Sequence, residues 1–321
     1  MSAGGPTPAP VAVAVVGSVH QDLHLRVDEL PRPGETLMAR EWERSPGGKG
    51  ANQAVACATA NQAVACATAG ARTAMVGAVG GDAAAETVVQ ALEVAGVDVA
   101  TVERLSGRAT STAVVTVSAD GTNSIVVAAD ASVALAAGAV EAALGRLPGL
   151  AVVLSQAEVP EEVVRAAVTG AAAAGARTVH NLAPYRPADA ALLARCDPLV
   201  VNEVEAAALA RDLGLAGSEP EELAGRLAAS CASVVVTLGA RGAVWARGRE
   251  RGHVPAPEVP VVDTSGAGDA FVGALCASLA RGDGLDDACA AGVAAGARAV
   301  QHRGAQAARP SVDASSEPSL A

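Results

Sequence analysis

The chain alternates short valine-rich runs with longer alanine-rich segments, and this alternation restricts the fold more than any other feature. The short runs have the length of buried strands, whereas the longer segments follow a helical period. Strands that alternate with helices form a parallel sheet covered by helices on both faces. The predicted fold class is therefore α/β. We expect strands at 11–16, 72–79, 150–154, 177–181, 198–201 and 233–238, then a hairpin through Trp245; helices are expected from Ala51 and at 83–95, 133–146, 160–174, 188–194, 203–211, 219–230, 268–281 and 285–300.

The composition indicates a core of small aliphatic side chains. Of 321 residues, 51% are hydrophobic, which excludes disorder of the whole chain and suffices for one large core or two modest ones. The chain has only one Phe, one Tyr and two Trp, so many small contacts replace a few large rings. Buried parallel strands flanked by alanine-rich helices suit this composition.

The charge balance excludes broad classes of partner. Asp and Glu number 34 against 23 Lys and Arg, a net charge of −11, whereas binding to nucleic acid or to an anionic membrane needs a basic surface. We find neither a membrane-spanning stretch nor the basic start of a signal peptide, so we expect a cytoplasmic protein that acts on small molecules. The six cysteines show no CxxC spacing, which indicates reduced core residues and no disulfide or zinc framework.

Two β-rich segments interrupt the alternation, at about 23–45 and 108–128. The second contains the Asp120-Gly121 pair, a hairpin signal. Residues 1–10 and 309–321 are rich in Pro, Ser, Gly and Ala without periodicity, so we expect disordered tails there and one folded domain at 11–308.

A perfect tandem repeat stands in the first predicted helix. Residues 51–59 read ANQAVACAT, and residues 60–68 repeat the same nine letters. Nine residues add about 2.5 helical turns, so both flanks cannot keep their register if the whole insert stays helical. Either one copy loops out, or the helix extends and re-enters the sheet by a changed connection. We expect the first copy to keep any role in a binding site and the distortion to fall near Ala69 and Gly70.

Two glycine-rich turns are the candidates for ligand binding. The segment 263–271, DTSGAGDAF, joins a strand to a helix, and backbone N–H groups at a helix N-terminus suit an anion such as phosphate. Asp269 there is either a helix cap or a general base beside a phosphoryl group. The segment 47–53, GGKGANQ, opens the first helix in the same manner and holds the only lysine, Lys49. Neither segment matches the GxxxxGK[ST] pattern of phosphate-binding loops or the GxGxxG pattern of dinucleotide-binding folds. The absence of the second pattern makes a nicotinamide dehydrogenase a less favoured hypothesis.

The order of the motifs resembles the ribokinase-like family of carbohydrate kinases over residues 11–306. The resemblance rests on GSVHQD at 17–22, PGET at 33–36, GGKGANQ at 47–53, NEVE at 202–205, TLGARG at 237–242, DTSGAGDAF at 263–271 and RGAQ at 303–306. It implies a three-layer α/β/α sandwich with a mostly parallel central sheet. It further implies a small β-sheet lid made of 23–45 and 108–128, which excludes water and joins two copies into a homodimer.

The resemblance also implies the reaction, transfer of the γ-phosphate of ATP to O5 of D-ribose with Mg²⁺ and an activating K⁺. Asp269 is the implied base, and the backbone of Gly266, Ala267 and Gly268 the implied anion hole. Implied sugar-binding residues are His20, Asp22, Gly48, Lys49, Gly50, Asn52, Glu158 and Asp269; implied nucleotide-binding residues are Asn202, Thr237, Leu238, Gly239, Ala240, Arg241, Gly242, Gly268 and Val293. Asn202 and Glu205 would hold Mg²⁺ through water, and Asp263, Ser265, Ala299, His302 and Gly304 a monovalent cation.

Several residues have a structural alternative. Asn202 is equally suited to capping a helix, Asp22 to ending a strand, and Glu158 to a solvated helix start before Pro160. His20 stands where ribokinases usually carry an Asn that contacts the sugar, so a kinase for another furanose, a deoxysugar or a nucleoside stays open. The repeat likewise leaves open a non-catalytic homologue that binds sugar or nucleotide.

Overall fold

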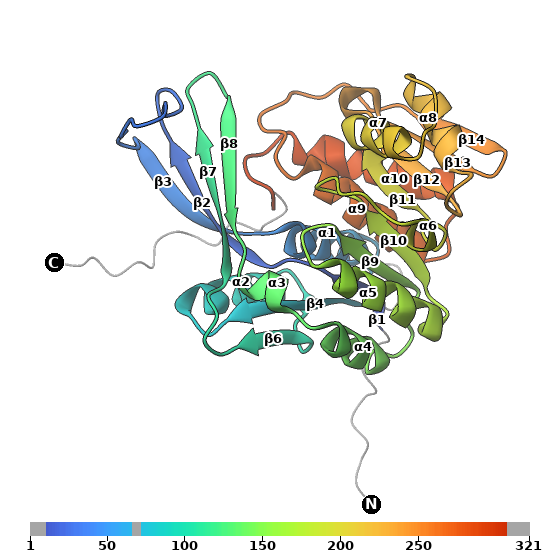
Figure 1. Ribbon diagram of the computed structural model, residues 1–321, viewed down its shortest axis with the longest axis horizontal. Helices are drawn as coiled ribbons and strands as arrows, with labels where there is room; N and C mark the ends of the chain where they lie inside the picture. The colour runs from blue at the N-terminus through green and yellow to red at the C-terminus, as the bar shows by residue number, and fades with distance from the viewer. Residues whose placement is uncertain (1–10, 66–71, 307–321) are drawn as a thin grey trace, which may run out of the picture.

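A central sheet organises the molecule. The computed structural model describes residues 11–65 and 72–306, and ten strands of these residues join in the order β14-β13-β12-β11-β10-β9-β1-β4-β5, with β6 beside β4 (Figure 1). The strands are β1 Val11–Val16, β4 Arg72–Gly80, β5 Val97–Asp98, β6 Val102–Leu105, β9 Val152–Gln156, β10 Arg177–Asn181, β11 Leu199–Asn202, β12 Val234–Thr237, β13 Ala243–Arg247 and β14 Glu250–Val254. All pairs are parallel except β12 with β13 and β13 with β14. The predicted mostly parallel sheet is confirmed; β5 and β6 were not predicted.

Helices cover both faces of this sheet. They are α1 Lys49–Ala65, α2 Ala83–Val94, α3 Ala131–Ala134, α4 Ala137–Gly145, α5 Glu161–Ala174, α6 Ala190–Leu193, α7 Glu203–Asp212, α8 Pro220–Leu227, α9 Ala267–Ala280 and α10 Leu285–Ala299. Side chains of a strand alternate between faces, and in β1 Val13 and Val15 pack with α1, α9 and α10. Ala14 and Val16 pack on the other face with α4 and α5. Covering on both sides explains why β1 is apolar at every position.

The helix expected at 133–146 is wrong as one element, because α3 and α4 are separate. Leu135 and Ala136 between them have extended backbones, with ψ of 127° and 141°. Leu135 and Val140 are both buried in the same core cluster. Five residues of helix would turn their side chains well apart, so the break restores a common face.

A second, smaller sheet stands out from the body of the molecule (Figure 1). It has the order β3-β2-β7-β8, with β2 at His20–Arg26, β3 at Glu41–Gly47, β7 at Ser111–Val117 and β8 at Asn123–Ala128. The two β-rich segments therefore join as expected from the family resemblance. Every residue of β8 is exposed, including Ile125, Val126 and Val127. Pairing of two copies through this sheet stays a prediction, which these exposed apolar side chains favour.

The tandem repeat lengthens α1. The helix includes the whole first copy and continues through Ala65 of the second. The first copy does not loop out, and the helix extends into the second copy; the rest of that copy and its connection to the sheet lie outside the described residues. Ala69 and Gly70 lie outside the described residues, as do both predicted tails.

Among the residues that the structure describes, no helix is long and apolar enough to span a membrane.

Close packing of α1 against α9 depends on Gly273. A Cβ atom at Gly273 would lie 2.8 Å from the Cys57 nitrogen and from the Gln53 carbonyl oxygen. The Cys57 thiol donates a hydrogen bond of 3.2 Å to the Gly273 oxygen. The two backbones approach this closely only because residue 273 has no side chain.

We predict that Gly273→Ala lowers the free energy of unfolding by about 1–3 kcal/mol, because the added methyl group overpacks the contact between α1 and α9. Urea unfolding followed by circular dichroism measures the change. The matched control is Gly138→Ala in α4, where the site is exposed and no atom lies within 4 Å of the added Cβ. There we expect a gain of about 0.5–1 kcal/mol, since alanine is the better helix former. Equal stability of wild type and Gly273→Ala would contradict the claim that the contact between α1 and α9 requires a glycine at position 273.

Candidate active site

The glycine-rich turn before α9 places Asp269 in the first turn of that helix. Gly266 precedes the helix with a φ of 73°, in the left-handed region. A Cβ atom there would lie 2.5 Å from the Ala305 Cα. Glycine is therefore required both for the backbone conformation and for the approach of the chain near Ala305. The amide groups of the turn and the helix N-terminus together form an environment that suits an anion.

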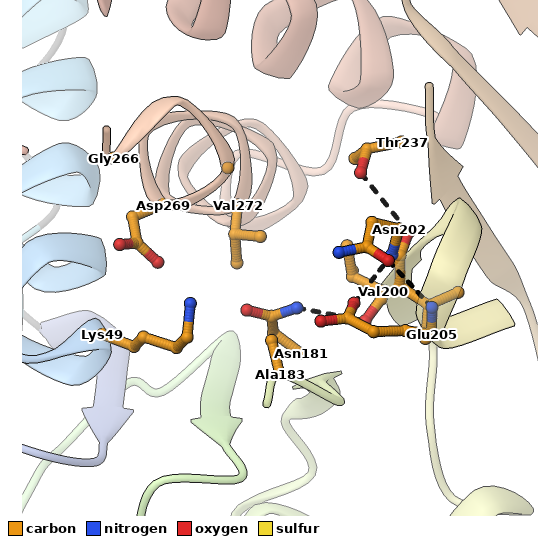
Figure 2. A pocket seen from close by; sticks show the side chains of 12 residues that line it. Lys49, Asn181, Ala183, Val200, Asn202, Glu205, Thr237, Gly266, Asp269 and Val272 are labelled. Carbon is orange, nitrogen blue, oxygen red and sulfur yellow. Dashed lines mark hydrogen bonds between the residues drawn. The ribbon is translucent and has the colours of Figure 1, made fainter. Parts of the chain in front are cut away.

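A cavity of about 140 Å³ lies in front of this turn. Three of its residues, Asn181, Asn202 and Thr237, are the last residues of β10, β11 and β12. Ligands of parallel sheets bind at the carboxyl ends of the strands, so the position is as expected. The remaining lining residues are Lys49, Ala183, Val200, Val201, Glu205, Gly266, Gly268, Asp269 and Val272 (Figure 2).

Asp269 is buried and hydrogen-bonded to two amides of α1. Its side chain Oδ1 accepts from Gln53 Nε2 at 2.9 Å, and Oδ2 accepts from Asn52 Nδ2 at 3.3 Å. Burial raises the pKa of Asp269 above its ordinary value, although Lys49 and the two amides oppose the shift. A carboxylate with a raised pKa beside an anion-binding turn can accept a proton from a substrate.

Lys49 supplies the positive charge of the cavity. Its side chain points toward Asp269 and Asn181 (Figure 2). Burial lowers the pKa of Lys49, but Asp269, Glu158 and Glu205 outweigh it and hold the pKa above the ordinary value. The Lys49 ammonium group is thus charged at every pH at which both the fold and an ionised Asp269 are expected.

His20 and Asp22 face the second glycine-rich turn from β2. They are two residues apart in the strand, so their side chains share one face. The Asp22 carboxylate lies over Gly47, where a Cβ atom would collide with it. His20 Nε2 and Asp22 Oδ1 are buried and have no hydrogen-bond partner among the described residues. A bound ligand with hydroxyl groups would relieve both, since a buried unpaired polar atom is costly.

Glu158 holds the glycine-rich turn in place. Its Oε2 accepts hydrogen bonds from the Ser18 hydroxyl at 2.6 Å and from the Lys49 backbone N–H at 2.9 Å. Gly50 N donates to the same Ser18 hydroxyl at 3.3 Å. The structural alternative of a solvated Glu158 is wrong, because the carboxylate joins three segments near the site, and its contact with a sugar stays a prediction. Gly50 is thereby fixed beside Ser18, and contact of Gly48 and Gly50 with a sugar stays a prediction.

Asn202 and Glu205 form a capping box at the start of α7. Glu205 N donates to Asn202 Oδ1, and Asn202 N donates to Glu205 Oε2, both at 2.8 Å. The helix-cap alternative for Asn202 is confirmed, and both residues also line the cavity. Burial raises the pKa of Glu205. No group of three or more His, Cys, Asp or Glu within 11–65 and 72–306 could hold a metal ion. Asn202 and Glu205 alone offer two side chains with oxygen donors. Such a pair fits a Mg²⁺ ion that keeps several of its bound waters.

The residues expected to hold a monovalent cation lie partly together. Asp263 accepts hydrogen bonds from Ser265 N at 2.8 Å and from Gly304 N at 2.9 Å. These hydrogen bonds outweigh burial and lower the pKa of Asp263. An ionised Asp263 carboxylate supplies the charge that such a cation needs, although both of its oxygens already accept backbone N–H groups. Ala299 and His302 line a separate cavity of about 370 Å³ between α1, α9 and α10.

The expected nucleotide residues do not all face the cavity. Thr237 lines it, whereas Leu238 is buried in the core beside β12. Residues 239–241 form an exposed short 3₁₀ turn in which Arg241 pairs with Glu203, and Gly242 ends it. Val293 is 7% exposed, packs in the core and lines neither cavity, so the geometry gives its predicted contact with the nucleotide no support.

Comparison with known proteins decides the family. The family model described as "pfkB family carbohydrate kinase" matches residues 12–312. The chain belongs to the pfkB family of carbohydrate kinases. This pfkB-family chain is 32% identical to the ribokinase of Staphylococcus aureus over 304 residues, 93% of the chain and 96% of the relative. It is 31% identical to the deoxyribokinase of Salmonella typhi over 310 residues, 94% of the chain and 96% of the relative.

Solved structures agree with this assignment. A ribokinase from Thermotoga maritima superposes with a TM-score of 0.82 at 30% identity, covering 94% of the pfkB-family chain and 96% of the other. Ribokinase from Arabidopsis thaliana, solved in complex with ribose and ATP, gives a TM-score of 0.79 at 28% identity, with 93% and 95% covered. The ribokinase-like α/β fold is thereby confirmed.

Sequence reasoning missed three buried amides of this kinase, Gln53, Gln156 and Asn181. Gln53 bonds to Asp269, and Gln156 and Asn181 bond to Gln53. Gln53 follows Asn52 inside a motif already singled out. The other two were detectable as amides at the last positions of the buried strands β9 and β10.

Asp22 predicts an unusual dependence of stability on pH. Burial, with Glu158 and Asp269 adding to it, raises the pKa of Asp22 to about 7. The folded state therefore keeps a proton that the unfolded chain releases above about pH 4, and stability falls as pH rises from 4 through 7. We expect Asp22→Asn to raise the free energy of unfolding at pH 8 by up to about 4 kcal/mol, with little change at pH 4.

Urea unfolding at both pH values measures this difference. The control is Asp287→Asn at an exposed position of α10. This substitution should change the free energy of unfolding by the same amount at pH 4 and at pH 8. An Asp22→Asn variant no more stable than wild type at pH 8 would contradict the raised pKa.

Proposed function

We propose that this carbohydrate kinase transfers the γ-phosphoryl group of ATP to O5 of D-ribose, forming D-ribose 5-phosphate and ADP. The observation that carries the proposal is the buried Asp269 carboxylate at the start of α9, beside the backbone of Gly266 and Gly268 and facing Lys49. The ribokinase relatives and the Arabidopsis thaliana ribokinase complex with ribose and ATP support both substrates.

Asp269 is the general base in this proposal. Its carboxylate takes the proton of the primary hydroxyl as O5 forms a bond to the γ-phosphorus, and the bond from that phosphorus to the bridging oxygen of ADP breaks. Backbone N–H groups of residues 266–268 stabilise the charge on the transferred phosphoryl group. The Lys49 ammonium favours the ionised form of Asp269, because its charge opposes the effect of burial on the pKa of Asp269.

Two cations complete the proposed site. Asn202 and Glu205 would hold Mg²⁺ through water, and the ion would neutralise charge on the nucleotide phosphates. K⁺ would be held by the Asp263 carboxylate and backbone oxygens near Ser265, Ala299, His302 and Gly304. Asp263 already joins the loop before α9 to the chain near Gly304, so this region orders the anion-binding turn. The small sheet of β2, β3, β7 and β8 serves as the lid that excludes water.

We predict that Asp269→Asn lowers kcat for D-ribose by about 10²–10⁴-fold, the contribution of a positioned base. The measurement is ADP release by purified protein with ATP, Mg²⁺, K⁺ and D-ribose, against a reaction without sugar. Asp287→Asn on the exposed face of α10 should retain the wild-type rate. An unchanged rate in Asp269→Asn would exclude the proposed base. Binding of D-ribose without turnover in wild type would instead favour a non-catalytic homologue.

The identity of the acceptor depends on His20 and Asp22. Their unpartnered Nε2 and Oδ1 atoms lie on one face of β2 and together suit two neighbouring hydroxyl groups. In the furanose form, which leaves O5 free, D-ribose has neighbouring hydroxyls at C1, C2 and C3, whereas 2-deoxy-D-ribose has no two hydroxyls on adjacent ring carbons. This observation favours ribose over the deoxysugar, the substrate that the name of the Salmonella typhi relative suggests.

We predict a kcat/KM for D-ribose at least about tenfold above that for 2-deoxy-D-ribose, because the deoxysugar leaves a buried polar atom unpaired. His20→Leu should narrow the ratio by lowering kcat/KM for D-ribose alone. Steady-state rates with both sugars test this. A higher kcat/KM for the deoxysugar, or for a nucleoside in the same assay, would replace ribose as the acceptor.

A further inference from the structure

A chain of buried side-chain amides lies behind Asp269. Gln156 Nε2 donates to Gln53 Oε1 at 2.7 Å, and Gln53 Nε2 donates to Asp269 Oδ1 at 2.9 Å. Both glutamines are fully buried. They come from β9 and α1, whereas Asp269 belongs to α9, so the chain joins three elements of the fold. The proposed reaction assigns none of these glutamines a role.

The hydrogen bonds determine which way each amide points. Because Gln53 Oε1 accepts from Gln156, the Gln53 nitrogen must face Asp269. Its other N–H group donates to Asn181 Oδ1 at 2.9 Å. Asn181 is oriented in turn, since its own nitrogen donates to the Val200 oxygen at 3.2 Å. Gln53 therefore uses both donors and has one orientation that satisfies all partners.

The two oxygens of Asp269 are held unequally. Oδ1 accepts the short hydrogen bond from Gln53, whereas Oδ2 accepts a longer one of 3.3 Å from Asn52. Asn52 is itself bonded through Oδ1 to Gln306 Nε2 at 3.0 Å. Each oxygen accepts one hydrogen bond, but the shorter one anchors the carboxylate at Oδ1, and the longer one leaves Oδ2 better able to accept a proton.

We propose that Gln53 is a positioning residue that holds Asp269 through Oδ1, so that Oδ2 takes the proton of the acceptor hydroxyl. The inference rests on the proposed function, because it needs Asp269 to be the base. Gln156 and Asn181 act on Gln53 and not on the substrate. A base displaced by even an ångström loses much of its effect on the rate, which gives the anchor a catalytic consequence.

The hydrogen bond also favours the ionised form of Asp269. An amide N–H stabilises a carboxylate more than a carboxylic acid, and Gln53 is among the groups that oppose the effect of burial. The other charges near Asp269 are Lys49 on α1, which favours ionisation, Glu158, which disfavours it, and Asp22 on β2, whose own pKa Asp269 helps to raise. Removing only the Gln53 donor therefore raises the pKa of Asp269 while these charges stay in place.

The test compares Gln53→Met, which removes the donor and keeps the shape, with Gln53→Glu, which replaces the donor with an acceptor. We expect kcat for D-ribose to fall about 10–100-fold in Gln53→Met and further in Gln53→Glu, with each KM changed by less than about threefold. The acidic limb of the kcat profile should move up by about one pH unit in Gln53→Met. Gln90→Met, at an exposed position of α2, is the matched control and should behave as wild type.

A second readout does not require turnover. Carbon-13 labelling of aspartate carboxyl groups allows the Asp269 resonance to be assigned by its loss in Asp269→Asn and then titrated by NMR. We expect its midpoint in Gln53→Met to lie above that of wild type by about one unit. Thermal unfolding of each variant verifies that the protein is folded at the temperature of the titration.

The outcomes separate this inference from the proposed function. If Asp269→Asn is inactive but Gln53→Met keeps both kcat and the wild-type titration, Gln53 has no positioning role and the base assignment survives. A lower kcat in Gln53→Met with both the acidic limb and the NMR midpoint unmoved shows a structural role only and also overturns the inference. Unchanged turnover in Asp269→Asn removes the base, and the inference fails with it.

Discussion

The arrangement of the site and of the helices around it depends on the burial of one carboxylate, that of Asp269. An ionised Asp269 is stable inside the protein only if nearby groups replace the water that it loses. Two amides of α1 and the Lys49 ammonium do so, and all three belong to the first turns of one helix. That helix must then approach α9 closely, which explains the absence of a side chain at Gly273. The contact between α1 and α9 is thus part of the hydrophobic core and also holds the groups that surround Asp269.

The charge of the site follows from the same arrangement. Asp269, Glu158 and Glu205 all influence Lys49, and Asp22 lies near two of these carboxylates. Burial raises the pKa of Asp22, Glu205 and Asp269, and the one lysine does not balance the four acidic groups. A site of this charge accepts a nucleotide phosphate more readily with a divalent cation than without one, because the cation offsets the repulsion.

The tandem repeat is compatible with this site because of where it adds length. The first turn of α1 is anchored by hydrogen bonds from Ala51 N to the Ser18 oxygen and from Asn52 N to the Gly48 oxygen. Asn52 and Gln53 therefore keep their positions whatever follows them. The second copy continues the helix at its far end, through Ala65. A helix extended at its C-terminus leaves the geometry of its N-terminus unchanged.

The sequence by itself determined the α/β class and the parallel sheet, and singled out the two β-rich segments and Asp269, since hydrophobic periodicity and glycine-rich turns are local features. It also singled out Lys49 and Asn52, which the structure brings beside Asp269. Only the tertiary structure separated α3 from α4, because the burial of both Leu135 and Val140 depends on the sheet beneath them. The partners of Gln53 and the unpaired atoms of His20 and Asp22 were likewise decided by folding. Gln53 and Gln156 are 103 residues apart, and no local pattern records that α1 and β9 bring them into contact.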